Sequence, residues 1–176
     1  MTRLYEHLML ATECSDFDHG AQAVAFALAR QGGLALRAVL PLTSNPEYEA
    51  VAPQVAAQAE SAALVKAESL QAEAATAQIS LALQVRRGPE AYAEIVTGAL
   101  ESGIDLLVIR QRGKRGILAN LLLGEMVSKV VSHAPCPVVV CPRNAQPWRR
   151  AVMVGLDPLA PLPSLLSQAM AVAVDS

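Results

Sequence analysis

The sequence has few aromatic residues and no long apolar run. Aromatic side chains make up 3% of its 176 residues, although hydrophobic residues make up 53%. No segment approaches the ~20 consecutive apolar residues that a membrane-spanning helix needs. The opening residues place Tyr5, Glu6 and His7 ahead of any apolar run, which is not typical of a secretory signal. We therefore expect neither a membrane span nor a membrane partner.

Cysteines are few and lack a metal-binding spacing. Cys14, Cys136 and Cys141 are an odd number without a Cys-x-x-Cys pair, which indicates neither a disulfide framework nor a zinc site. We therefore expect a reduced, cytoplasmic setting. The net charge of −2 argues against general nucleic-acid binding. No Ser-His-Asp or paired-carboxylate arrangement can be placed, so we predict no catalytic residues and no enzymatic activity.

Apolar runs alternate with helix-like segments along residues 1–146, which we take as one domain. The alternation predicts right-handed β-α-β crossovers and a mostly parallel sheet. The predicted fold class is α/β, an open doubly wound sheet with helices on both faces. The expected strands are 6–12, 34–42, 79–88, 105–110 and 137–142, and the expected helices are 18–33, 47–76, 90–103 and 124–134.

Residues 147–176 resemble the beginning of the chain. Aligning Ala151 with His7 places Asp157 opposite Glu13, with an apolar run before each acid and an Ala-rich segment after it. This pattern predicts a strand at 151–156, a helix at 164–174 and therefore a partial second repeat. The alternative is that any strand-turn-helix segment would look similar.

A glycine-rich, basic loop follows the fourth expected strand. The segment "IRQRGKRGILANLLLGEM", residues 109–126, contains four basic side chains before Gly116 and ends in Gly124-Glu125-Met126. The N-terminus of a helix attracts anions because its backbone N–H groups are unpaired. Gly124 would let a phosphate approach the backbone closely. The segment lacks the spacing and the hydroxyl of a P-loop.

This loop and the following "VSKVVSHAPCPVVV" resemble the signature of the universal stress protein family. The resemblance implies a five-stranded sheet of order 3-2-1-4-5, dimers joined through the fifth strand, and either ATP binding or its loss. The half-repeat resembles tandem members of the family. In a sheet of this order the ligand crevice lies at the carboxyl ends of strands one and four. The residues that the resemblance assigns to a nucleotide are Thr12, Glu13, Val39, Arg110, Arg112, Gly113, Gly124, Glu125 and Met126.

The sequence departs from the ATP-binding pattern of that family at four points. Arg110 replaces the first glycine of the turn, and ten residues instead of nine separate Gly113 from Gly124. Glu13 replaces an aspartate, and Glu125 replaces a hydroxyl residue. A carboxylate at the first turn of a helix is stabilised by ~0.3–1 kcal/mol. Glu125 would therefore take the place of a phosphate, paired with Arg110 or Arg112; the alternative is that it points to solvent.

Two hypotheses follow for function. The first is a regulatory or stress-response module whose nucleotide pocket is degenerate and which acts through dimerisation. The second is a switch that binds ATP or another adenine nucleotide. We expect a homodimer formed through strand 137–142 and the 147–176 segment, with Trp148 at the crossing; the alternative is a disordered tail. Cys14 is expected to be either a reactive thiol beside the crevice or an idle one.

Overall fold

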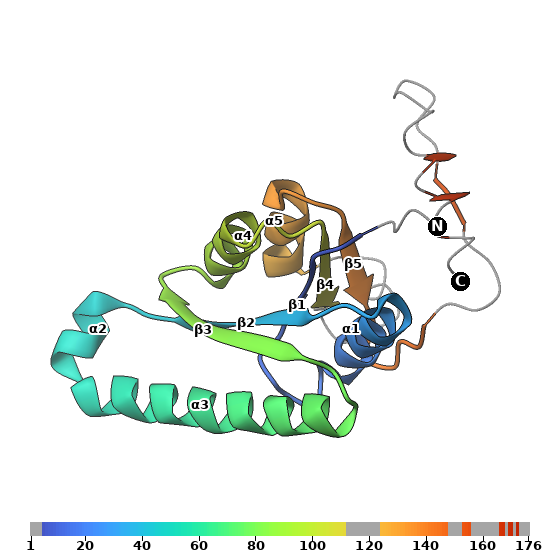
Figure 1. Cartoon of the computed structure of the whole chain (residues 1–176). Coiled ribbons are helices and arrows are strands. Elements are labelled where there is room, and N and C mark those ends of the chain that lie inside the picture. The colour runs from blue at the N-terminus through green and yellow to red at the C-terminus, as the bar shows by residue number, and fades with distance from the viewer. Residues whose placement is uncertain are drawn as a thin grey trace.

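The computed structural model describes residues 5–111, 124–147 and 153–155, and residues 166, 167, 169, 170 and 172. Its five strands form one parallel sheet in the order β3-β2-β1-β4-β5 (Figure 1). The predicted α/β class and strand order are confirmed. The strands are β1 (Leu8–Ala11), β2 (Leu36–Thr43), β3 (Leu81–Gly88), β4 (Leu106–Arg110) and β5 (Val138–Cys141), and the helices are α1 (His19–Gly32), α2 (Pro46–Val51), α3 (Pro53–Thr76), α4 (Ala91–Glu101) and α5 (Glu125–His133).

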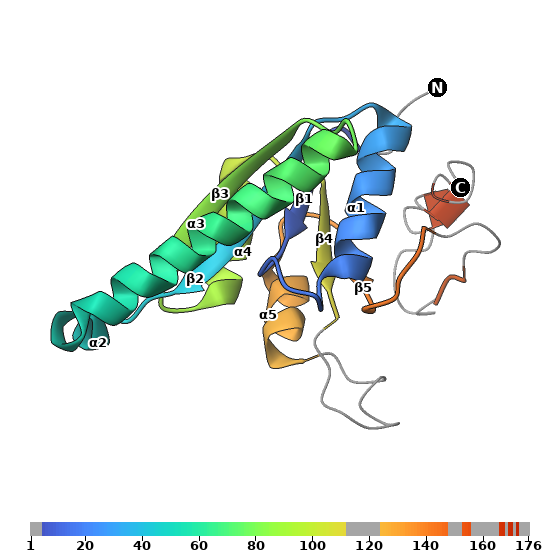
Figure 2. The ribbon, with the colours of Figure 1, turned by 90° about the horizontal axis from the view of Figure 1, so that it is seen from below.

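The sheet separates two layers of helices, each with its own hydrophobic cluster. Helices α1 and α3 cover one face, and α4 and α5 cover the other (Figures 1 and 2). Leu8 and Leu10 of β1 pack into the first cluster, whereas Met9 and Ala11 pack into the second. Because β1 is buried on both faces, its sequence is a continuous apolar run without polar alternation.

The long helix expected over 47–76 is in fact two helices. α2 ends at Val51, α3 begins at Pro53, and Ala52 between them has a non-helical backbone with φ −135° and ψ 64°. The proline ring clashes with the preceding residue when that residue is helical, which explains the break. The expected stop of α1 is confirmed, because Gly33 adopts the left-handed conformation that a helix C-terminus favours.

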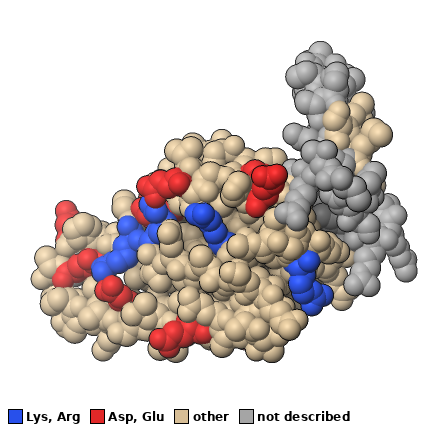
Figure 3. Space-filling view, viewed as in Figure 1, with Lys and Arg blue, Asp and Glu red and all other residues tan. Residues whose placement is uncertain are grey.

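The edge strand β3 carries two arginines that are paired with acids of the neighbouring helices. Arg86 contacts Glu94 and Glu101, and Arg87 contacts Glu49 and Glu60. On the face shown in Figure 3, basic and acidic side chains lie next to one another instead of forming a field of one sign.

Most of the expected half-repeat lies outside the described residues, including Trp148. Met153 to Gly155 are described and are not in a strand, and residues 166, 167, 169, 170 and 172 are helical. The packing of 147–176 on a dimer interface therefore stays a prediction.

The chain that leaves β5 passes closely over the first turn of α1. A Cβ atom added at Gly20 would lie 2.0 Å from the carbonyl oxygen of Pro142 and 2.8 Å from the backbone nitrogen of Ala145. Both obstacles are backbone atoms, which cannot move aside by a side-chain rotation. Only glycine therefore allows this contact between α1 and residues 142–145.

We predict that Gly20→Ala destabilises the protein by about 1–3 kcal/mol, because the added methyl group must push two backbone segments apart. Gly32→Ala, at the other end of the same helix, is the matched control. There the new Cβ would meet only the movable side chain of Leu34. We expect a change within about 0.5 kcal/mol for this control. Urea unfolding of both variants would measure the difference, and equal stabilities would contradict the close contact.

Candidate functional site

The carboxyl ends of β1 and β4 lie side by side at the centre of the sheet. Ala11 and Ile109 are register partners, so Thr12, Glu13 and Arg110 meet at the same edge. Arg110 is 9% exposed although it carries a full charge. Its Nη2 lies 2.7 Å from Oε2 of Glu13, and its Nε lies 3.1 Å from Oδ1 of Asp18. The guanidinium therefore bridges two carboxylates of the turn that joins β1 to α1.

Asp18 is the most deeply buried charged residue of this cluster, with 1% of its surface exposed. Its Oδ2 accepts hydrogen bonds from the backbone N–H and the hydroxyl of Ser15, at 2.9 and 2.8 Å. Among the described residues Oδ1 receives no well-directed hydrogen bond. A buried carboxylate needs a compensating charge, and the Arg110 guanidinium at 3.1 Å provides it.

Phe17 connects this cluster to the chain that follows β5. The guanidinium carbon of Arg110 lies 5.8 Å from the centre of the Phe17 ring, and that of Arg143 lies 4.9 Å from it. A cation over an aromatic face contributes ~0.5–1 kcal/mol at an exposed site. The β1–α1 turn is thus held both by ion pairs from β4 and by contacts from residues after β5.

Thr12 and Val39, which the resemblance assigns to a nucleotide, hold the backbone of the turn between β1 and α1. The N–H of Thr12 donates to the Val39 carbonyl at 3.0 Å, and the Thr12 hydroxyl accepts the N–H of Cys14 at 2.8 Å. Thr12 and Val39 are 4% and 1% exposed. Cys14 has a positive φ of 49°, which is uncommon for a residue with a side chain. The backbone of this turn is therefore held by hydrogen bonds within the protein itself.

The Cys14 thiol is not activated. Burial is the main reason that its pKa rises to about 11 from an ordinary 9.0, and the Thr12 hydrogen bond offsets only part of this rise. A reactive cysteine needs a lowered pKa, since the thiolate is the nucleophile. The hypothesis of a reactive thiol at Cys14 is wrong for this environment.

At the start of α5, the structure contradicts the expected partner of Glu125. The Glu125 side chain is 85% exposed, and its Oε1 lies 3.2 Å from Nζ of Lys129, one turn further along the same helix. Arg110 is directed toward Glu13 and Asp18 instead. The pairing of Glu125 with Arg110 is therefore wrong, because a residue four positions away on an exposed helix is the nearer cation. Arg112 and Gly113 lie outside the described residues.

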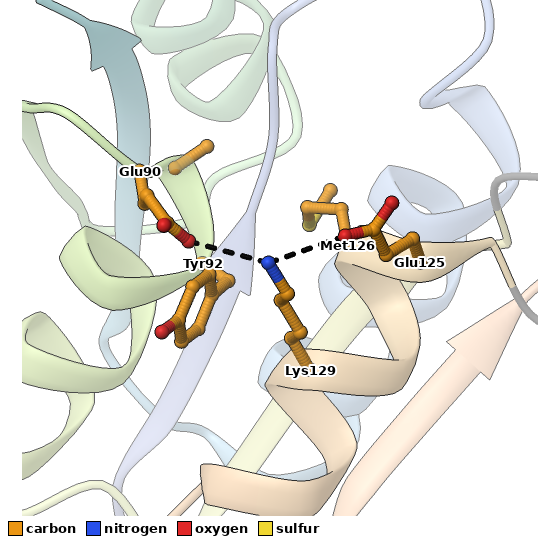
Figure 4. A pocket seen from close by; sticks show the side chains of 6 residues that line it. Glu90, Tyr92, Glu125, Met126 and Lys129 are labelled. Carbon is orange, nitrogen blue, oxygen red and sulfur yellow. Dashed lines mark hydrogen bonds and ion pairs between the residues drawn. The ribbon is translucent and has the colours of Figure 1, made fainter.

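A cavity of about 360 Å³ opens beside Glu125, between the first turns of α4 and α5 (Figure 4). Met126 lines it from α5, and Gly124, the residue before this helix, has an extended backbone with ψ 153°. The structure thus divides the nine expected residues. Four lie around the carboxyl ends of β1 and β4, including Val39, which is the β2 register partner of Ala11; three lie at the start of α5, and two are not described. The residues that line the cavity are Glu90, Ala91, Tyr92, Glu125, Met126 and Lys129.

Sequence reasoning missed Asp18, Phe17 and Arg143 at the crevice and Glu90, Tyr92 and Lys129 at the cavity. Asp18 had a detectable signal, since an acid directly before a helix and close after β1 reaches the same edge as Arg110. The other residues come from distant parts of the chain and carry no motif.

The described residues contain no group of three or more His, Cys, Asp or Glu that could hold a metal ion, and in the same ranges no helix has the length and apolarity to cross a membrane.

Comparison with known proteins agrees with this fold. The sequence model of the universal stress protein family matches residues 4–142. The chain belongs to the universal stress protein family. A universal stress protein of Thermus aquaticus is 32% identical over 144 residues, which are 78% of this chain and 98% of that protein.

Two solved structures share the fold of this universal stress protein. UspA from Lactobacillus plantarum is 23% identical with a TM-score of 0.67, covering 80% of this chain and 99% of its own. A family protein from Arabidopsis thaliana with AMP bound is 18% identical with a TM-score of 0.56, covering 80% of this chain and 93% of its own.

We predict that Arg110→Met lowers the free energy of unfolding by about 3 kcal/mol, because it leaves the buried Asp18 carboxylate without its cation. Adding Asp18→Asn to this variant should recover part of the loss by removing the uncompensated charge. Urea unfolding of the two single variants and the double variant would give the coupling energy. Additive effects of the two substitutions would contradict a stabilising ion pair.

Proposed function

We propose that this universal stress protein is a regulatory module without catalytic chemistry, whose nucleotide crevice is filled by its own side chains. The observation that carries the proposal is the bridge from Arg110 to Glu13 and Asp18. Arg110 stands where the ATP-binding pattern of the family has a glycine. A side chain therefore occupies space that the pattern leaves open for a ligand.

The charges of the crevice also oppose a phosphate. Two carboxylates face one guanidinium at the ends of β1 and β4, so that cation is already neutralised by Glu13 and Asp18. An incoming phosphate would have to break two short ion pairs to reach it. The degenerate pocket expected from the sequence is thus attributed to Arg110, whereas the exposed and paired Glu125 has no part in closing it.

Regulation without catalysis is supported by the chemistry of the described residues. The thiol nearest the crevice, Cys14, has a raised pKa and is protonated at neutral pH, so it would not act as a nucleophile. The cytoplasmic setting expected from the cysteine pattern belongs to the same proposal.

The second candidate is a switch that binds an adenine nucleotide. The AMP-bound Arabidopsis relative, which has the same fold, favours it. The start of α5 also keeps one element of a phosphate site, because Gly124 precedes the unpaired N–H groups of a helix. In this case Arg110 would have to leave its two acids and turn toward the phosphates.

We predict that calorimetric titration with ATP and Mg²⁺ detects no micromolar binding to the unaltered protein. Arg110→Gly should create or strengthen binding, because it removes the occupying side chain and frees the crevice. Glu125→Ser removes a charge of the same region without opening the crevice, and it should leave binding unchanged. Arg110→Gly leaves the buried Asp18 carboxylate without its cation, which destabilises the protein. The double variant R110G/D18N is therefore included, because it also removes that carboxylate charge. Circular dichroism would confirm that each variant is folded.

Micromolar binding to the unaltered protein would favour the nucleotide switch and overturn the filled crevice. Binding that appears with Glu125→Ser but with neither Arg110 variant would assign the closure to Glu125 instead.

Dimerisation is the second part of the proposal. β5 lies at the edge of the described sheet, and its three valines are only half-buried within a single copy. A strand edge with unpaired backbone groups and apolar side chains favours association. We propose that two copies meet along residues 137–142 and that the 147–176 segment contributes to this interface.

We predict that the full chain is a dimer and that deleting residues 147–176 weakens it. The reason is that the deletion removes the apolar segment that would cover the neighbouring copy. Light scattering over a range of protein concentrations would give the mass of both forms. A shortened protein that remains an equally stable dimer would show that this segment has no role in association.

A further inference from the structure

The cavity between α4 and α5 differs in chemistry from the crevice at the strand ends. Its walls come from the N-terminal parts of two helices, and they carry two carboxylates, one ammonium and one aromatic ring (Figure 4). Tyr92 is half-buried, packs against the core cluster of this face and lies 5.7 Å from the His133 ring. The aromatic wall is therefore held in place by the fold.

The ammonium of Lys129 occupies a cage formed by three of these groups. Its Nζ lies 3.4 Å from Oε2 of Glu90, 3.2 Å from Oε1 of Glu125 and 5.1 Å from the centre of the Tyr92 ring. The hydrogen bonds to Glu125 and Glu90 raise the Lys129 pKa, so the ammonium stays charged. Two carboxylates and an aromatic face are the groups by which proteins hold an organic ammonium.

The charge and the lining of the cavity select the class of ligand. Two carboxylates and one ammonium leave a net charge of −1, which opposes anions such as phosphates. No group of three metal ligands occurs among the described residues, which does not favour an inorganic ion. Ala91, Met126 and the Tyr92 ring offer apolar surface to a carbon chain. The matching ligand is a cation that carries an aliphatic part.

The Lys129 ammonium can be displaced from its ion pairs with Glu90 and Glu125. Its side chain is 40% exposed, and its partners Glu90 and Glu125 are 52% and 85% exposed. Ion pairs this exposed are weak, and the four-carbon stem of lysine lets the ammonium turn into solvent. We propose that this cavity binds a small organic cation, an alkylammonium or an alkylguanidinium, which replaces the Lys129 ammonium between Glu90, Glu125 and Tyr92.

None of the cage groups belongs to the Arg110 bridge, so the proposal does not depend on whether Arg110 fills the crevice. It is tested with n-butylammonium and n-butylguanidinium at low ionic strength, by calorimetry and by the NMR shifts of the Tyr92 ring. Butanol and butyrate, which have the same carbon chain without the positive charge, are the control ligands. Both cations should bind saturably, and the two control ligands should not.

Lys129→Met removes the internal competitor and should tighten cation binding by about tenfold, since two exposed ion pairs and one cation–π contact no longer have to be broken. Lys66→Met, on α3, removes the same charge outside the cavity and should leave the affinity unchanged. Tyr92→Leu keeps an apolar side chain but removes the ring, and it should weaken binding severalfold. Thermal melting would confirm that each variant is folded.

The proposal is overturned if neither the unaltered protein nor Lys129→Met binds the two cations saturably. Equal tightening by Lys66→Met would also overturn it, because the effect would then come from overall charge and not from the cage.

Discussion

The burial of the Arg110 guanidinium between Glu13 and Asp18 is the interaction on which this end of the molecule depends. It joins the end of β4 to the turn between β1 and α1, and it compensates a carboxylate that is 1% exposed. Through Phe17 the same guanidinium is connected to Arg143 and hence to the chain after β5. Three segments far apart in the sequence are therefore held at the point where a doubly wound sheet places its ligand.

This arrangement changes how a universal stress protein fold can be used. The crevice at the strand ends contains a cation and two acids that satisfy one another, whereas the cavity between α4 and α5 contains a cation that is only loosely held by exposed partners. Buried ion pairs are costly to separate and exposed ones are not. We therefore propose that the first site is closed by its own side chains and that Lys129 in the second can be displaced.

Much of the fold could be predicted from local pattern. The apolar run of β1 was recognisable because a strand that is buried on both faces needs apolar residues throughout. The end of α1 at Gly32-Gly33 was recognisable because the helix C-terminus requires a left-handed backbone, which glycine adopts easily. The break at Ala52 was missed although Pro53 was visible, because an Ala- and Glu-rich segment outweighed the effect of one proline. The strand order came from resemblance to a family, since alternation of strands and helices permits several orders.

The sequence alone determined that this is an α/β protein of the universal stress protein family, and that Arg110 and Glu125 depart from the ATP-binding pattern. Only the tertiary structure decided which partners these two side chains contact. Glu125 pairs with Lys129 because residues four positions apart on a helix lie on the same face. Arg110 pairs with Glu13 and Asp18 because β1 and β4 are parallel neighbours, which brings their carboxyl ends together. An ion pair depends on the distance between two charged groups in space, and for residues far apart in the sequence the packing of the sheet sets that distance.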